Sequence, residues 1–412
     1  MRVLCIGLLL AAAVGVRAGA PAAAPTLRVV IEYPGSSAPS GAQVGLRGDG
    51  LGLSWSESLP AERVGQDQWA VDLRLPAGSD APTNVSMKPM MDGAWCKGQN
   101  FVVDLSSGLG VVVLHPWFWA SSQLAILGGV WSPQLGNTRD VILYLPGAAV
   151  ENPLRRFSGA DVLVAHDGQN LFNASTSAFG TAWMMQNTAD PDIDAGRARP
   201  YIIVGVYNTA NRTYEYTPQP DPTVGDGGGA DLLLDFYEQT VYPLVASVLN
   251  VEPPPRRGTP PPAAGEEDLR WPMLGSSLGG LLSCYAAWTR PGVYGKAGCM
   301  SSSFWWDGEH FLNATLAKAS PATAPPVDWY VDSGDSGPDN DDEAQTLRVY
   351  NRMQQLGYEP GQLPDAAASA RGSVWHYVQP GGRHNEKYWG ERFYIPERLL
   401  LGPKVLRPTP LA

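Results

Sequence analysis

One stretch of the chain sets a serine in a tight, glycine-lined turn. Residues 271–287 read Trp-Pro-Met-Leu-Gly-Ser-Ser-Leu-Gly-Gly-Leu-Leu-Ser-Cys-Tyr-Ala-Ala, so that Gly275, Ser277 and Gly279 form Gly-x-Ser-x-Gly. Apolar residues precede this pentapeptide and a helix-forming run follows it, which is the strand-turn-helix context that a serine nucleophile requires. Small neighbours are needed because the turn strains the central residue. The alternative interpretation is a glycine-rich turn without chemistry.

A serine alcohol needs a base to activate it and an acid to orient the base. In a strand-turn-helix site of this kind, the acid follows the serine in the chain and the histidine follows the acid. Among five histidines, His384 comes directly after an expected strand and Gly381-Gly382-Arg383, where we expect the base. His376 lies inside that strand and is interpreted as structural. His166 ends a strand upstream of Ser277 and is expected to shape the pocket.

The acid is expected in the loop after the strand predicted at 327–331. This loop is rich in carboxylates: Asp332, Asp335, Asp339, Asp341, Asp342 and Glu343. We predict Asp341 as the acid, with Asp339 as the alternative, because Asp332 should still belong to the strand and Glu343 begins a helix. A calcium loop would be a competing use of these residues, but the run lacks the glycine and the terminal glutamate of an EF-hand. We therefore predict neither a metal site nor an organic cofactor.

An oxyanion hole needs backbone N–H groups that point at the reacting carbonyl. The amide of Leu278, directly after the serine, is the first candidate. The second should come from the loop after an earlier strand, residues 166–172, where the amide of Gly168 or Gln169 is expected. A further group follows the strand at 201–206 and either lines the pocket or forms a surface loop: Tyr207, Asn208, Arg212, Tyr214 and Glu215.

Strands and helices alternate over most of the chain, which is typical of a mainly parallel sheet covered by helices on both faces. The expected strands are 123–127, 140–145, 161–166, 201–206, 271–274, 297–301, 327–331 and 373–378. Helices are expected at 229–248 and 343–356. The α/β domain is predicted to span residues 120–402. A proline-rich insertion at 252–268 interrupts it and is expected to be a surface loop, either near the site or away from it.

Residues 27–115 show short alternating runs separated by turn residues, which predicts a small all-β sandwich. Trp55, Trp69 and Trp95 are spread through it, either as core and edge aromatics or as a platform for sugar rings. Through Leu53-Ser54-Trp55, the strand around Trp69 and the run 88–100, this part distantly resembles starch-binding-type carbohydrate modules. That resemblance implies a carbohydrate-binding role.

The first residues have the pattern of a secretory signal peptide, predicted at 1–20. Arg2 precedes an apolar run at 3–14, and no other stretch is long and apolar enough to span a membrane. Four sequons agree with a secreted or lumenal glycoprotein: Asn84, Asn173, Asn211 and Asn313. A net charge of −11 argues against a nucleic-acid partner. The oligomeric state is not predicted.

The mature chain would keep three cysteines, Cys96, Cys284 and Cys299, because Cys5 would leave with the signal. An odd number excludes a fully paired disulfide framework. We favour three unpaired, buried thiols. The alternative is that Cys284, on the helix after the serine, and Cys299, on the next strand, face each other.

Four motifs together resemble the "Putative esterase" family of α/β-hydrolases, which includes siderophore esterases, S-formylglutathione hydrolase, and feruloyl and acetylxylan esterases. They are Leu163 to Phe172, the turn at Ser277, Asp332-Ser333-Gly334-Asp335, and Gly381 to Glu386 with Trp389. The resemblance covers about residues 120–400. It implies an eight-stranded hydrolase sheet and a Ser-acid-His triad with Ser277 and His384. The acid loop departs from the short family pattern.

These features together predict a secreted serine esterase that hydrolyses a carboxylic ester through an acyl-enzyme. Its partner would be a small-molecule or glycan ester, including siderophore-like substrates. An acyltransferase using the same triad is one alternative. A carbohydrate-binding protein that keeps the hydrolase fold without turnover is the other.

Overall fold

The structure is a computed structural model that describes residues 26–74, 82–106, 108, 110–263, 267–361 and 372–409. The predicted signal peptide, residues 1–20, lies outside the described residues. No helix in the described ranges is long and apolar enough to cross a membrane.

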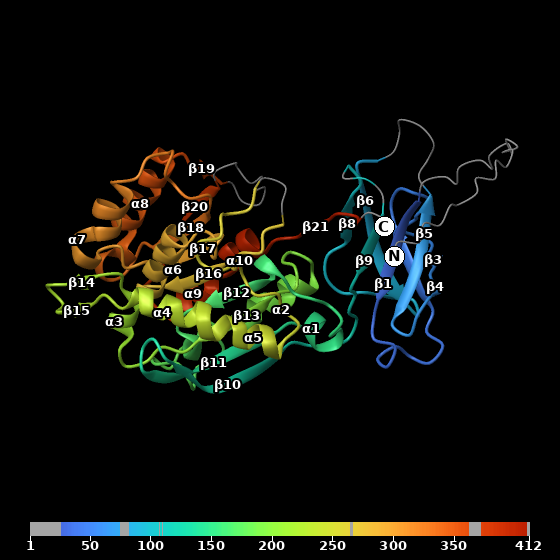
Figure 1. Ribbon diagram of the computed structural model, residues 1–412, viewed down its shortest axis with the longest axis horizontal. Coiled ribbons are helices and arrows are strands. Elements are labelled where there is room, and N and C mark those ends of the chain that lie inside the picture. The colour runs from blue at the N-terminus through green and yellow to red at the C-terminus, as the bar shows by residue number, and fades with distance from the viewer. Residues whose placement is uncertain are drawn as a thin grey trace, which may run out of the picture.

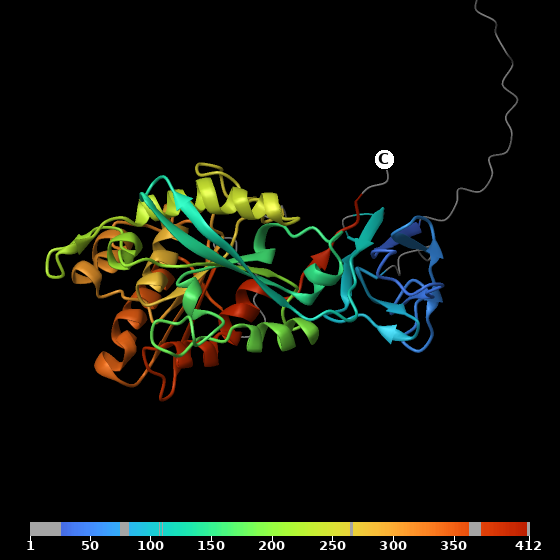
Figure 2. The same ribbon diagram turned by 90° about the horizontal axis from the view of Figure 1, so that it is seen from below.

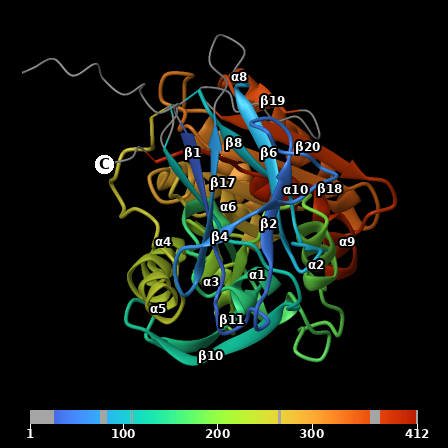
Figure 3. The same ribbon diagram turned by 90° about the vertical axis from the view of Figure 1, so that its right-hand side faces the viewer.

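An N-terminal β domain is present as expected, and its strands form two sheets around one core (Figure 3). Along the first strand every second residue is buried, so Leu27, Val29 and Ile31 point inward. The first sheet has the order β4 (Glu62–Arg63), β5 (Gln68–Arg74), β1 (Thr26–Glu32), β9 (Val111–Leu114). The second has the order β21 (Val405–Leu406), β8 (Phe101–Asp104), β6 (Asn84–Met91), β2 (Val44–Gly48), β3 (Leu59–Pro60), with β7 (Ala94–Trp95) paired to β6.

The second part of the chain is built on a large, mainly parallel sheet (Figure 1). Within the described residues this sheet has nine strands, in the order β10 (Gln123–Ser132), β11 (Asn137–Leu145), β13 (Ile202–Val206), β12 (Val162–Ala165), β16 (Met273–Ser276), β17 (Lys296–Met300), β18 (Asp328–Gly334), β20 (Ser373–Gln379), β19 (Glu359–Pro360). All eight predicted strands are confirmed. The family resemblance implied eight strands in this sheet, which is one too few. The ninth, β19, has two residues and is too short to leave a periodic signal in the sequence.

The central strands are buried along their whole length because helices cover both faces. One face packs against α4 (Ala230–Phe236), α5 (Tyr242–Val248), α6 (Leu278–Thr289) and α8 (Glu343–Gln355). The other packs against α2 (Gln186–Asp194), α9 (Glu386–Arg392) and α10 (Tyr394–Leu401), and Figure 2 shows the sheet between the layers. Shorter elements fill the connections: α1 (Gly147–Glu151), α3 (Arg212–Tyr216), α7 (Trp306–His310), the hairpin β14 (Pro220–Asp221) and β15 (Asp226–Gly227), the 3₁₀ turns η1 (Gly159–Asp161), η2 (Gly168–Asn170) and η5 (Pro338–Asp342), and the π turns η3 (Tyr237–Val241) and η4 (Phe311–Leu316).

Both predicted helices are confirmed. The first is continuous through α4, the π turn η3 and α5, and the second is α8.

The favoured interpretation of three unpaired cysteines is wrong, because Cys284 on α6 and Cys299 on β17 form a disulfide. The crossover from β16 through α6 to β17 lays the helix against the neighbouring strand, which brings the two Cα atoms to 6.1 Å. Cys96 is unpaired and buried.

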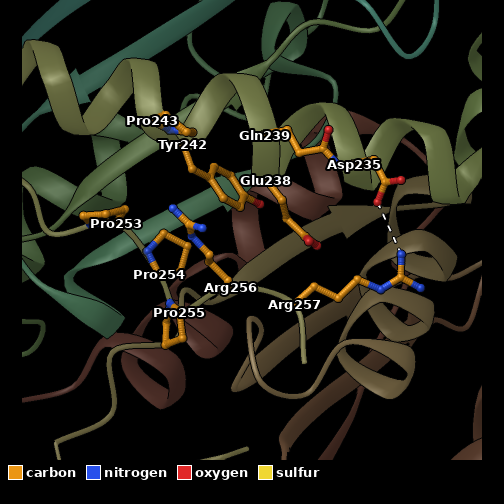
Figure 4. Close-up of a pocket in the computed structure, with 10 residues that line it drawn as sticks. All are labelled: Asp235, Glu238, Gln239, Tyr242, Pro243, Pro253, Pro254, Pro255, Arg256 and Arg257. Atoms are coloured by element: carbon orange, nitrogen blue, oxygen red, sulfur yellow. Dashed lines mark hydrogen bonds and ion pairs between the residues drawn. The ribbon is translucent and has the colours of Figure 1, made fainter. Parts of the chain in front are cut away.

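The described part of the proline-rich insertion contains no helix and no strand, but it packs against the body of the domain. Figure 4 shows residues 253–257 facing helices α4 and α5 across a cavity of about 630 Å³. Arg257 lies 3.5 Å from Asp235 of α4. The insertion leads into the amino end of β16, whereas Ser277 follows its carboxyl end. The insertion therefore lies away from the serine.

Among the contacts that join the β domain to the sheet domain, two sets stand out in the described residues. The amide of Asn152 donates to the carbonyl oxygens of Glu32 and Pro116, at 2.8 and 3.0 Å. The C-terminal tail crosses back, because β21 pairs with β8 and Thr409 pairs with Val111. We propose the divisions 27–115 and 120–402 as the two domains, with the tail at 403–409 added to the first.

Candidate active site

The turn at Ser277 has the backbone strain that the sequence predicted. Ser277 lies between β16 and α6 with φ of 59° and ψ of −127°, a conformation that a residue with a side chain rarely adopts. Its N–H donates to the carbonyl of Met300 at 3.1 Å, and its carbonyl accepts from Ser303 N–H at 3.0 Å. A Cβ on Gly275 would lie 2.7 Å from backbone atoms of Gly279, so the turn requires glycine there.

His384 and Asp341 are brought together although 43 residues separate them. His384 follows β20 and precedes α9, and Asp341 lies in η5, which follows β18. The imidazole Nδ1 lies 2.7 Å from Asp341 Oδ1. The Asp341 side chain is fully buried, whereas the imidazole is 34% exposed. His384 Nε2 has no partner among the described residues, so this nitrogen is available to a serine or a substrate.

Asp341 is held by hydrogen bonds on both carboxylate oxygens. Oδ2 accepts from Ser301 Oγ at 2.6 Å and from the Gly334 N–H at 2.5 Å. Burial would raise the pKa of Asp341, but the hydrogen bonds from His384, Ser301 and Gly334 outweigh it and keep the pKa below its ordinary value. The acid is therefore ionised and His384 Nδ1 is the donor. Asp339, the alternative acid, is exposed, and the described residues show no hydrogen bond or ion pair between it and His384.

Ser301 is the centre of a buried network beneath this pair. Its hydroxyl accepts from Trp389 Nε1 at 2.9 Å and from Arg392 Nη2 at 2.5 Å, while it donates to Asp341. Arg392 also binds Asp332 at 2.8 and 2.9 Å, and Asp332 remains within β18 as predicted. The Trp389 ring stands edge-on to His384, with centroids 5.1 Å apart. These contacts restrict the orientation of both the acid and the base.

The expected oxyanion donors lie at the first positions of two helices. Leu278 begins α6 and Gly168 begins η2, and the first N–H groups of a helix have no intrahelical acceptor. Gly168 must be glycine, because a Cβ there would collide with the carbonyl oxygen of Gly205 in β13. The Gln169 side chain accepts from the Asn208 N–H at 3.2 Å, which ties the loop to the strand beside it.

Residues after β13 divide into two groups. Arg212 makes a bidentate ion pair with Asp167 at 2.7 and 2.8 Å, and Asn208 donates to the same carboxylate at 2.6 Å. They therefore support the loop that begins at Gly168. Glu215, in contrast, is buried against Arg139 at 2.9 Å, which is a structural role.

His166 packs under the turn, and no hydrogen bond joins it to Ser277 among the described residues. Its Nδ1 is 3.2 Å from the Tyr237 hydroxyl, and a Cβ on Gly275 would lie 2.7 Å from its ring atom Cδ2. Burial lowers the pKa of His166 to about 4, so the imidazole is neutral. His376 lies in β20 and stacks on Tyr350 with ring centroids 4.9 Å apart.

Sequence reasoning missed three contributors to this site. Ser301 and Arg392 hold the acid, and the Ser303 hydroxyl lies 3.3 Å from that of Ser277. The run Ser301-Ser302-Ser303 at the end of a predicted strand was an available signal. Arg392 gave none, because an arginine on a helix is ordinarily a surface residue.

Residues 132–396 match the family described as "Putative esterase". The chain belongs to this esterase family. Over 273 residues it is 25% identical to the uncharacterized protein YbbA of Bacillus subtilis (strain 168), covering 65% of this chain and 93% of that protein. It is 31% identical over 155 residues to a siderophore triacetylfusarinine C esterase of Aspergillus fumigatus, covering 37% of this chain and 47% of that protein.

Among solved structures, an IroE-like serine hydrolase from Shewanella oneidensis is 19% identical, with a TM-score of 0.49, over 68% of this chain and 80% of that one. The family match makes this protein a carboxylic ester hydrolase, as the sequence predicted. The esterase combines an α/β-hydrolase sheet with an N-terminal β domain.

Proposed function

We propose that this esterase acts through an acyl-enzyme formed on Ser277. His384 Nε2 takes the proton of the Ser277 hydroxyl as its oxygen attacks the ester carbonyl. The same proton then passes to the alcohol oxygen as the carbon–oxygen bond breaks and the alcohol leaves. Water, deprotonated by His384, adds to the acyl group, and the acid is released with Ser277 restored. Leu278 and Gly168 or Gln169 supply the N–H groups that bind the oxyanion.

We assign to Asp341 the role of orienting the His384 imidazole, because Asp341 remains a carboxylate throughout the reaction. Its lowered pKa means that it does not accept the proton from His384, and its charge stabilises the imidazolium that forms during each half-reaction. The carrying observation is that the strained Ser277 turn, Asp341 and His384 follow β16, β18 and β20, which are parallel strands whose carboxyl ends lie at the same edge of the sheet.

The test is hydrolysis of short-chain p-nitrophenyl esters by the parent and by Ser277→Ala. We expect kcat/KM to fall by roughly 10⁴-fold or more. Ser320→Ala, at an exposed serine, should match the parent. A fluorophosphonate probe should label the parent and not Ser277→Ala. If Ser277→Ala still hydrolyses these esters, the nucleophile is assigned wrongly. The products formed with and without an added sugar alcohol distinguish hydrolysis from acyl transfer, because acyl transfer gives an ester of that alcohol and hydrolysis gives the free acid.

We also propose that the enzyme is secreted and modified on the way. The Cys284–Cys299 disulfide supports an oxidising compartment, and the four sequon asparagines Asn84, Asn173, Asn211 and Asn313 are all exposed. Enzymatic deglycosylation of the secreted protein should lower its mass. An unchanged mass would show that none of these asparagines carries an N-linked glycan.

For the substrate we propose an ester on a glycan or a siderophore-like molecule. The glycan option is supported by Trp55 and Trp95, which are 39% and 41% exposed with ring centroids 6.2 Å apart, whereas Trp69 is buried in the core. Flat exposed rings pack on apolar ligand faces. If this pair binds sugar, Trp55→Ala should lose retention on insoluble polysaccharide and keep activity on soluble esters. Equal retention would exclude this role.

A further inference from the structure

A large cleft separates the β domain from the sheet domain, and the site described above does not use it. Its volume is about 1210 Å³. Its walls are the strands β6 and β8, the segments that lead into β12, β13 and β17, and the tail that carries β21. Ligand sites occur preferentially at domain interfaces of this kind.

The cleft lies at the opposite edge of the sheet from Ser277. Its lining residues Asp161, Arg199 and Lys296 precede or begin parallel strands, whereas Ser277 follows a strand. The strands concerned have four or five residues, which separates the two edges by roughly 13–17 Å. In Figure 1 the β domain accordingly lies at one end of the sheet domain and the helix α7, which follows β17, at the other. A ligand in the cleft would not touch the ester.

The charge of the cleft is opposite to that of the protein. The whole chain carries a net charge of −11. Among its described lining residues, however, the cleft has four Asp or Glu side chains and six basic ones: Arg155, Arg156, Arg199, Lys296, Lys404 and Arg407. Asp161 already pairs with two of these, Arg199 at 2.6 Å and Lys404 at 2.9 Å.

Arg155 and Lys296 have no acidic partner within ion-pair distance in the described ranges. The Arg155 Nε is buried without a hydrogen-bond partner, and its guanidinium lies over the Phe157 ring at 5.1 Å. The Lys296 ammonium donates to the carbonyl of Leu400 at 3.1 Å. Burial lowers the pKa of Arg155 and that of Lys296, because the protein compensates neither charge in full. Buried cations are ordinarily paired.

We propose that this interdomain cleft binds a small polyvalent anion whose charged oxygens belong to phosphate or carboxylate groups. Arg155 and Lys296 are the principal residues that bind it. The Arg155 guanidinium presents paired N–H donors that match such oxygens, and Lys296 adds a point charge. Arg156 lies at the rim, with its side chain 63% exposed, and Glu267 lines the same cleft.

The experiment measures binding of inorganic phosphate and of citrate to the full chain by isothermal titration calorimetry, at constant pH and at constant ionic strength set with chloride. The two probes separate a preference for phosphate from one for carboxylate. We expect Arg155→Gln and Lys296→Gln each to raise the dissociation constant roughly tenfold or more. Esterase activity on a short soluble ester reports that each variant is folded, because the cleft is remote from Ser277.

Two further variants distinguish the loss of a ligand contact from a folding defect. Glu267→Gln removes a negative charge from an exposed side chain of the cleft and should tighten binding. Lys318→Gln makes the matched change at an exposed lysine that does not line the cleft, and it should leave the dissociation constant unchanged. Absence of binding by the parent, or equal weakening by Lys318→Gln and Arg155→Gln, would overturn the proposal.

Discussion

At the scale of single residues, two aspartates two positions apart have different environments. Asp339 and Asp341 both lie in η5 with positive φ, of 51° and 55°. Asp341 nevertheless has 1% of its surface exposed and accepts hydrogen bonds from His384, Ser301 and Gly334, whereas Asp339 is exposed. An acid that orients an imidazole must be held still, and only Asp341 has the contacts for this.

The first prediction distinguishes these two aspartates. Asp341→Asn should lower kcat for p-nitrophenyl ester hydrolysis by roughly 10⁴-fold, because an amide stabilises the wrong imidazole tautomer. Asp339→Asn is the matched control and should stay near the parent. Steady-state kinetics on both variants checks this. A large loss in Asp339→Asn with an active Asp341→Asn would make Asp339 the acid.

At the scale of elements, a buried acid binds helix α10 to the residue directly before strand β13. Glu397 is fully buried, and its Oε1 accepts from the Tyr201 hydroxyl at 2.7 Å. Burial raises the pKa of Glu397 to about 8, and the nearby Asp192 adds to this. At neutral pH the folded protein therefore keeps this side chain protonated.

This predicts a stability that decreases as the pH rises. The unfolded chain loses the Glu397 proton near pH 4.3, whereas the folded chain holds it until about pH 8. The folded state thus binds more protons between these values, so the free energy of unfolding should fall across that range. Glu397→Gln, in which an amide N–H replaces the O–H of the protonated carboxyl and which does not titrate, should show a flatter pH dependence. Urea unfolding at pH 5, 6.5 and 8 measures it.

Glu391→Gln is the control for this experiment, because Glu391 is exposed and its replacement should leave the slope as it is in the parent. A slope in Glu397→Gln equal to that of the parent would show that other groups cause the pH dependence.

At the scale of the whole molecule, the C-terminal tail returns to the N-terminal β domain. β21 pairs with β8, and Thr409 exchanges hydrogen bonds of 2.8 Å with Val111. Lys404 of the same tail lies 2.9 Å from Asp161 of the sheet domain. The tail therefore contacts both domains, on the side of the sheet that is remote from Ser277.

Ending the chain at Gly402 should destabilise the β domain and leave ester hydrolysis intact. The lost backbone hydrogen bonds correspond to about 2–4 kcal/mol, and β8 would become an unprotected edge. Limited proteolysis should then cut the β domain faster than in the parent, with kcat/KM unchanged. A matching fall in kcat/KM would mean that the tail also supports the site.

The sequence by itself determined the alternating strands and helices, the β domain before them, and the esterase family, because these depend on local periodicity and on motifs contiguous in the chain. The positions of Ser277 and His384 at strand ends follow from the same signals. Only the tertiary structure decided which acid meets His384, that Cys284 pairs with Cys299, and that Ser301 and Arg392 support the acid. These contacts join residues distant in the chain, and sheet order, which local patterns do not encode, brings them together.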